Sequence, residues 1–173
     1  MMNIYLVGFM GTGKTAVGKA LAKELGFGFA DLDDLIEAKE GLKIVDIFAK
    51  KGESYFRDLE SKVLKETSRK QELVAACGGG IVLRQDNLNI MHDSGAAVCL
   101  EASPEVIYRR TKDHFHRPLL NVENPQAKIK ELLDKRVSFY AKIKNHIDTS
   151  DLSIEEVVDK INKIIQTTDS RLE

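Results

Sequence analysis

A glycine-rich stretch near the amino terminus, GFMGTGKT at residues 8–15, contains residue types that bind phosphate. It fits the pattern of a glycine, four residues, then glycine, lysine and serine or threonine. The fixed positions are held by Gly8, Gly13, Lys14 and Thr15. Because an apolar segment precedes the stretch and a helical pattern follows it, a phosphate-binding loop is a better interpretation than a chance glycine turn.

Each residue type in this loop has a chemical reason. Glycines let backbone N–H groups approach phosphate oxygens, and the positive end of the following helix faces the anion. Lys14 reaches the outer phosphates, where charge shifts during transfer, so we expect it to be catalytic, and the hydroxyl of Thr15 can bind Mg²⁺. The predicted phosphate contacts are Gly11, Thr12, Gly13, Lys14, Thr15 and Ala16.

Two carboxylates follow the second predicted strand, in the sequence DLDD at residues 31–34. Asp31 and Asp33 are two positions apart at a strand end, so both side chains can point the same way. One can hold Mg²⁺ through water while the other accepts a proton from a hydroxyl group. Alternatively, Asp33 or Asp34 simply caps the next helix, and the sequence leaves both interpretations open.

Three arginines are further candidates. Arg57 has glutamates at i−4 and i+3, so it can form an ordinary ion pair on its own helix. Arg136 has no carboxylate at these spacings and is either a binding residue or a solvated side chain. Arg117 lies in HRPLL, inside a segment without core periodicity (112–124), which suits a mobile lid that closes over phosphate.

The surrounding pattern alternates strands and helices, which predicts a parallel sheet covered on both faces. We expect a three-layer α/β/α fold with a central five-stranded parallel sheet. Ligands bind beyond the carboxyl ends of such strands, so the phosphate loop, the DLDD sequence and the glycines at 78–80 should converge. The predicted strands are 3–7, 27–30, 72–77, 96–102 and 146–148, and the predicted helices include 14–25, 33–39, 43–51, 53–70, about 84–93, one starting at Ser103–Pro104, 125–145 and one capped by Ser153 and Glu156.

The bulk properties suit one domain spanning residues 1–173, with a tail at about 167–173 expected to be disordered. The formal net charge of −1 provides no basic surface for nucleic acid. No apolar run is long enough for a membrane span, and no signal peptide is recognisable. Cys77 and Cys99 lie in apolar runs, as expected of reduced thiols in a cytoplasmic protein. A monomer is expected.

Taken in order and spacing, GFMGTGKT, DLDD, IFAKKGESYFRDLE, CGGG, RPLL and KRVSFY resemble the shikimate kinases over about residues 4–165. The resemblance implies a P-loop kinase fold and ATP- and Mg²⁺-dependent phosphorylation of the 3-hydroxyl of shikimate in aromatic amino-acid biosynthesis. It implies that Asp33 is the base, that Asp31 serves the metal through water, and that Arg117 is the lid arginine. The remaining implied contacts are Arg57, Gly79, Gly80 and Arg136 with shikimate, and Arg110 with adenine.

Two other functions fit parts of the sequence. Another small-molecule kinase of this fold, acting on gluconate or a nucleoside monophosphate, would keep the loop but should lack the two arginines and the triple glycine. A nucleotide-dependent switch without an acceptor would show only slow hydrolysis, and the Asp31–Asp33 pair and Arg117 argue against it. The guanine-reading sequence N-K-x-D is absent, since residues 145–148 read NHID.

Overall fold

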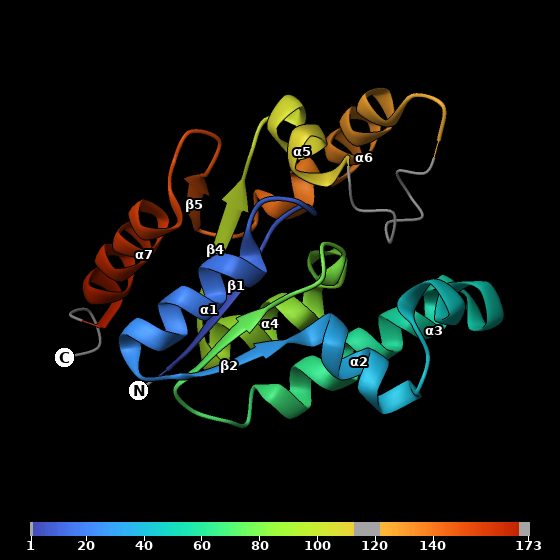
Figure 1. Cartoon of the computed structure of the whole chain (residues 1–173). Coiled ribbons are helices and arrows are strands. Elements are labelled where there is room, and N and C mark those ends of the chain that lie inside the picture. Colours follow the sequence, from blue (N-terminus) through green and yellow to red (C-terminus); the bar gives the residue numbers. More distant parts are fainter. Residues whose placement is uncertain (1, 113–121, 170–173) are drawn as a thin grey trace.

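A computed structural model describes residues 2–112 and 122–169, and it confirms the three-layer α/β/α architecture (Figure 1). Five parallel strands form one sheet in the order β2-β3-β1-β4-β5. The strands are β1 (Asn3–Val7), β2 (Gly28–Asp31), β3 (Leu73–Ala76), β4 (Gly95–Glu101) and β5 (Asn145–Asp148). The first strand of the chain therefore lies at the centre of the sheet.

The central strand shows why this sheet is buried on both faces. All five residues of β1, NIYLV, are buried, so the strand reads as a continuous run rather than an alternating one. Leu6 lies opposite Ala76 of β3 and Val98 of β4. Helices must therefore cover both sides of the strand.

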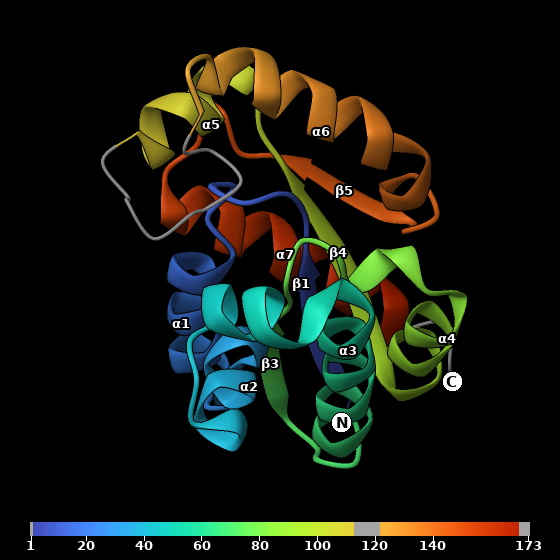
Figure 2. The ribbon, with the colours of Figure 1, turned by 90° about the vertical axis from the view of Figure 1, so that its right-hand side faces the viewer.

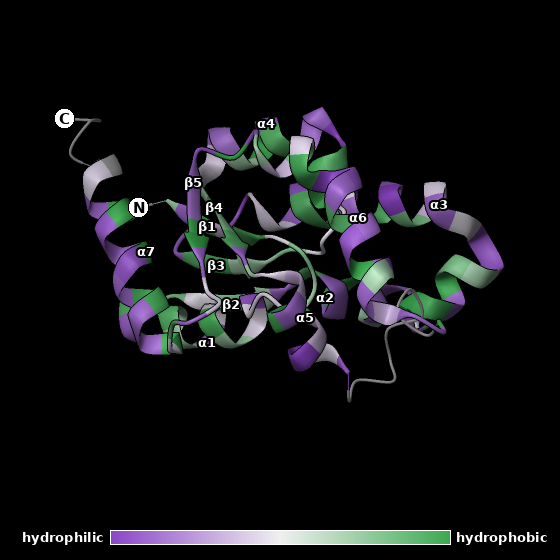
Figure 3. Cartoon of the chain, turned by 90° about the horizontal axis from the view of Figure 1, so that it is seen from above, coloured by the Kyte–Doolittle hydropathy of each residue, from purple (hydrophilic) through white to green (hydrophobic). Residues whose placement is uncertain are grey.

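Helices α1 and α7 cover one face, and α2, α3 and α4 cover the other. Figure 3 shows hydrophobic residues along the central strands, with hydrophilic residues gathered on the outer sides of the helices. Leu21 of α1 and Ile161 of α7 belong to one apolar cluster, whereas Leu64 of α3 and Met91 of α4 belong to the other. The helices are α1 (Lys14–Leu25), α2 (Leu32–Glu40), α3 (Ile44–Thr67), α4 (Gln85–Ser94), α5 (Pro104–Thr111), α6 (Pro125–Tyr140) and α7 (Ile154–Asp169), with a 3₁₀ turn at Ile81–Leu83.

Helices α5 and α6 lie beyond the carboxyl ends of the strands (Figure 2). They therefore sit on the side where a parallel sheet binds ligands. Among the described helices, none combines the length and apolar composition that a bilayer-spanning segment requires.

Several predicted boundaries shift. The expected helices 43–51 and 53–70 form one element, α3, bent at Gly52, whose φ of 80° and ψ of 171° break the helical path. The helix expected at 125–145 ends at Tyr140, because the chain turns into β5 there. Helix α7 continues to Asp169, into the expected tail, while residues 170–173 lie outside the described residues. Most of the predicted lid, including Arg117, also lies outside them.

Candidate active site

The phosphate loop joins β1 to α1, as predicted. Gly8 has a φ of 135°, and a Cβ placed there would lie 2.1 Å from the carbonyl oxygen of Leu100, so only glycine fits. Gly13, with a φ of 96°, precedes α1. No described side chain caps the first turn of α1 and no acid lies in that turn. The N–H groups at the start of α1 therefore suit an anionic ligand.

Lys14 is held against this loop. Its Nζ donates hydrogen bonds to the carbonyl oxygens of Gly8 and Phe9, each at 2.9 Å. The hydroxyl of the buried Thr12 also donates to the Phe9 carbonyl, at 2.8 Å. The ammonium group is thus positioned at the loop where the phosphates are expected.

Asp31 connects the second strand to the loop. The hydroxyl of Thr15 donates to Asp31 Oδ2 at 2.8 Å, and Asp31 Oδ1 accepts from the backbone N–H of Asp33 at 3.1 Å. The cap of α2 is therefore Asp31, and the alternative that Asp33 or Asp34 caps this helix is wrong. A hydroxyl and a carboxylate oxygen side by side are the hard oxygen ligands that Mg²⁺ prefers.

Asp33 points a carboxylate oxygen into the protein. Its Oδ1 is shielded from solvent and has no hydrogen-bond partner within residues 2–112 and 122–169. Burial, and next the negative charge of Glu60, raise the pKa of Asp33 to about 7, while the nearby Lys14 opposes this rise. A carboxylate with a pKa in this range is matched to proton transfer at neutral pH.

Arg57 is held by two carboxylates of its own helix. Its Nη1 lies 2.5 Å from Glu60 Oε2, and its Nη2 lies 3.0 Å from Glu53 Oε1. Both predicted ion pairs therefore exist. The pair with Glu60 is buried, since the two side chains are 12% and 2% exposed, whereas Glu53 is 63% exposed. Burial raises the pKa of Glu60, against the lowering effect of Arg57. These contacts fix the guanidinium in one orientation.

The glycines at 78–80 let these side chains approach the backbone. A Cβ on Gly80 would lie 2.1 Å from Arg57 Nη1, and one on Gly79 would lie 3.4 Å from Arg136 Nη1. The hydroxyl of Tyr140 donates to the Gly79 carbonyl at 2.7 Å, which orients the end of α6.

Arg136 completes the group. Its guanidinium carbon lies 5.7 Å from the centroid of the Phe9 ring, in the phosphate loop. Burial raises the pKa of Tyr140 to about 12, and the charge of Arg136 opposes this rise. Arg57, Gly79, Gly80 and Arg136 are therefore brought together beside the loop, from three distant parts of the sequence.

Arg110 makes a different set of contacts. Its Nη1 donates to the Gly11 carbonyl at 3.3 Å and to Thr149 Oγ1 at 3.0 Å, and its Nη2 donates to the Thr149 carbonyl at 2.8 Å. The guanidinium joins the phosphate loop to the segment after β5. Its contact with adenine stays a prediction.

Two residues of this region were not foreseen from the sequence. The sequence marks Glu60 only as an ion-pair partner of Arg57, although it is buried and its negative charge raises the pKa of Asp33. Thr149 is buried, and its hydroxyl contacts the carbonyl oxygens of Thr12 and Glu101. A polar residue directly after a predicted strand is the only sequence signal for Thr149.

Comparisons with known proteins agree with this geometry. The family model described as shikimate kinase matches residues 10–166. A curated shikimate kinase from Thermodesulfovibrio yellowstonii is 52% identical over 163 residues, which cover 94% of each chain. One from Caldanaerobacter subterraneus subsp. tengcongensis is 46% identical, with 93% of this chain and 94% of that protein covered.

Solved structures give the same result. Shikimate kinase from Acinetobacter baumannii in complex with shikimate superposes with a TM-score of 0.92 at 40% identity, covering 97% of this chain and 94% of that one. Shikimate kinase from Aquifex aeolicus superposes with a TM-score of 0.84 at 39% identity, covering 97% and 98%. A gluconokinase from Sinorhizobium meliloti, 16% identical with a TM-score of 0.61, shares the fold alone. Because the family model matches residues 10–166 and a curated relative is 52% identical over 94% of the sequence, this chain belongs to the shikimate kinase family.

Proposed function

We propose that this protein transfers the terminal phosphoryl group of ATP to the 3-hydroxyl of shikimate, giving shikimate 3-phosphate and ADP in the pathway to the aromatic amino acids. The observation that carries the proposal is the grouping of Asp33, Arg57 and Arg136 around the glycines beside the phosphate loop. It provides one proton acceptor and two guanidinium groups for a small hydroxylated acid.

On the acceptor side, the two arginines bind and orient the carboxylate of shikimate. A guanidinium can hold a carboxylate through two parallel hydrogen bonds, and Arg57 is pre-oriented for this by Glu53 and Glu60. Asp33 then accepts the proton of the reacting hydroxyl. Its pKa of about 7 leaves it ionised often enough at neutral pH and still basic enough to take the proton.

On the donor side, the backbone N–H groups of residues 11–16 hold the phosphates of ATP, and Lys14 stabilises the charge that develops during transfer. Lys14 can exchange its contacts with the Gly8 and Phe9 carbonyls for phosphate oxygens without leaving the loop. Thr15 and Asp31 would hold Mg²⁺, Asp31 through water. When bound, the ion neutralises phosphate charge.

The thiols of Cys77 and Cys99 are both free and buried, which fits a reducing cytoplasm. We place the enzyme there as a monomer, since one chain supplies every residue assigned above. Arg110 and Arg117 are proposed to bind ATP as well, and Arg117 to assist transfer, on the sequence resemblance.

A coupled assay of ADP release tests the function. The expected result is ADP release that depends on added shikimate and on Mg²⁺. Parallel reactions with gluconate and with nucleoside monophosphates, at the same ATP concentration, should give no increase over the rate without acceptor. Equal rates with and without shikimate would instead favour a nucleotide-dependent switch.

A further inference from the structure

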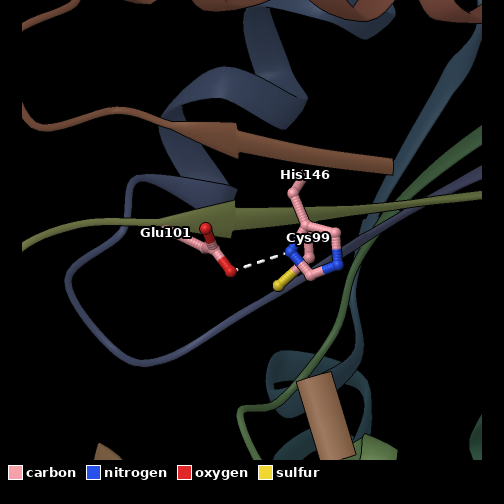
Figure 4. A group of neighbouring side chains, drawn as sticks. All are labelled: Cys99, Glu101 and His146. Carbon is pink, nitrogen blue, oxygen red and sulfur yellow. Dashed lines mark hydrogen bonds and ion pairs between the residues drawn. The ribbon is translucent and has the colours of Figure 1, made fainter. Parts of the chain in front are cut away.

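Three side chains able to bind a metal meet between β4 and β5, and none of them is assigned above to catalysis or to Mg²⁺. Cys99 and Glu101 are two positions apart in β4, so their side chains share one face of the sheet. In the parallel register Cys99 lies opposite His146 of β5. The thiol, a carboxylate oxygen and a ring nitrogen all lie within 4.8 Å of one another (Figure 4).

The hydrogen bonds of His146 determine which nitrogen can bind an ion. Nε2 lies 2.7 Å from the carbonyl oxygen of Ile143, which can only accept, so Nε2 carries a hydrogen. Nδ1 lies 2.8 Å from Glu101 Oε1. That contact is a hydrogen bond only when a hydrogen lies between the two atoms, and a bound ion would take the place of this hydrogen. Metal-binding histidines are commonly oriented in this way, by an N–H bond from the other nitrogen to a backbone carbonyl.

The surroundings give access to an ion and room for a further ligand. Cys99 is buried, whereas the side chains of His146 and Glu101 are 30% and 50% exposed, so an ion can enter from the surface. A cavity of about 350 Å³ borders both Cys99 and Glu101 and is also lined by Asp148, by residues of α6, and by Phe9 and Thr12 of the phosphate loop. This volume holds several waters, one of which can be a fourth ligand.

We propose that Cys99 Sγ, Glu101 and His146 Nδ1 form a binding site for Zn²⁺, with a water from the adjoining cavity as fourth ligand. Thiolate and imidazole ligands favour Zn²⁺ over Mg²⁺, which prefers oxygen. Zinc bonds of about 2.0–2.3 Å require the three ligand atoms to move closer, and the half-exposed Glu101 side chain can make this movement.

This site differs from the expected Mg²⁺ site in the chemistry of its ligands. The ion expected at Thr15 and Asp31 meets only oxygen, whereas the strand site offers sulfur and nitrogen. Without an ion, a cysteine thiol is protonated at neutral pH. Zinc binding must displace this proton, which gives the site a measurable signature.

Zinc binding would also stabilise one edge of the sheet. β5 is an edge strand that pairs only with β4 among the described strands. Thr149, directly after β5, donates its N–H to the Glu101 carbonyl at 2.8 Å and its hydroxyl to Thr12 of the phosphate loop. A cross-strand ion would therefore stiffen the segment that supports the loop.

The test uses the full chain without a purification tag, freed of metal and kept reduced. Zn²⁺ is titrated by calorimetry in excess Mg²⁺, in two buffers of different ionisation enthalpy. We expect one Zn²⁺ per chain with release of a proton. Co²⁺ in place of Zn²⁺ should give the near-ultraviolet band of a thiolate–cobalt bond. Absence of the band, or of proton release, would overturn the proposed ligand set.

Matched variants identify the ligands. Cys99→Ser and His146→Gln should each weaken Zn²⁺ binding by at least about 100-fold, more than loss of a supporting contact usually costs. Cys77→Ser and His92→Gln, which change the other cysteine and an exposed histidine, should bind normally. If Cys99→Ser does not fold, the Zn²⁺ affinity of Glu101→Gln, which changes the exposed ligand, tests the site instead. Unchanged affinity in the ligand variants, or equal loss in the controls, would show adventitious binding and reject the site.

Discussion

Asp33 and Glu60 direct carboxylate oxygens at the same glycine. A Cβ on Gly78 would lie 2.8 Å from Asp33 Oδ1 and 2.7 Å from Glu60 Oε1. Neither oxygen has a hydrogen-bond partner within the described residues. Two shielded carboxylates facing one small space repel each other when both are ionised, so the protonation of Asp33 depends on Glu60.

Glu60→Gln should therefore lower the pKa of Asp33, because it removes the largest charge that raises this pKa after burial. If Asp33 is the base, the acidic limb of the kcat/KM profile for shikimate should move to lower pH by roughly one unit. Glu53→Gln is the control, since it also removes a partner of Arg57 without appearing among the groups that shift Asp33. An unmoved limb in Glu60→Gln would contradict the assignment.

Asp33→Asn should keep ATP affinity and lose about 10²- to 10⁴-fold in kcat, because asparagine preserves the shape but cannot accept the proton. Steady-state kinetics and ATP binding by calorimetry measure the two effects separately. Asp34→Asn, at the exposed neighbouring position, should be close to normal. Normal turnover in Asp33→Asn would leave Asp33 without a role in proton transfer.

The same substitution should change how stability depends on pH. The pKa of Asp33 is about 7 in the folded protein and about 4 in an unfolded chain, so the folded state binds the proton more tightly. Its favourable contribution is complete below pH 4 and is lost as the pH rises towards 7. The free energy of unfolding of Asp33→Asn should therefore increase relative to that of the parent protein as the pH rises from about 4 to about 8, which denaturation at each pH measures.

Much of this site is predictable from the sequence because its parts are local. The phosphate loop needs only glycines, a lysine and a threonine at fixed spacing, and β1 needs only a short apolar run. The strand order could not be predicted, since no local signal says that β3 pairs with both β1 and β2.

Other features were missed because they depend on long-range contacts. The role of Glu60 depends on its distance from Asp33, 27 positions away in the chain. From the sequence alone, an ion pair of Arg57 and a role of Arg57 in binding are competing interpretations. In the structure the two are compatible, because the Arg57–Glu60 pair is buried and holds the guanidinium in place.

Arg57→Lys should raise the apparent KM for shikimate about 10- to 100-fold, with a much smaller effect on the KM for ATP. Lysine keeps the charge but lacks the planar pair of donors, and a hydrogen bond to a charged group contributes about 1.5–3 kcal/mol. Arg84→Lys serves as control, because Arg84 is half-exposed and pairs with Asp58. Equal changes in the KM values for shikimate and for ATP would indicate that Arg57 only forms a structural ion pair.

Gly80→Ala should resemble Arg57→Lys although it removes no functional group. The added methyl would lie 2.1 Å from Arg57 Nη1, so the guanidinium must move away from its present position. We expect the KM for shikimate to rise and the KM for ATP to change little. The kinetics of the double variant check the mechanism: effects that simply multiply would indicate that Gly80 acts independently of Arg57.

Lys14→Ala should reduce turnover by at least about 10³-fold, since it removes the charge that stabilises the transferring group. Circular dichroism should show an intact fold, because the bonds from Lys14 are to loop carbonyls rather than to the core. Lys23→Ala, at an exposed position of the same helix, controls for loss of a positive charge. Near-normal turnover in Lys14→Ala would overturn the phosphate-loop assignment.

The contacts of Arg110 and Thr149 bear on the order in which the protein can be completed. They join the phosphate loop to residues 99 and 137 positions later in the chain. During synthesis the loop emerges first, yet a nascent chain lacks these bonds until Thr149 has left the ribosome. The motif nearest the amino terminus is thus among the last to acquire its full set of contacts, and a carboxyl-terminal truncation before Thr149 would remove support from a loop that it leaves intact in sequence.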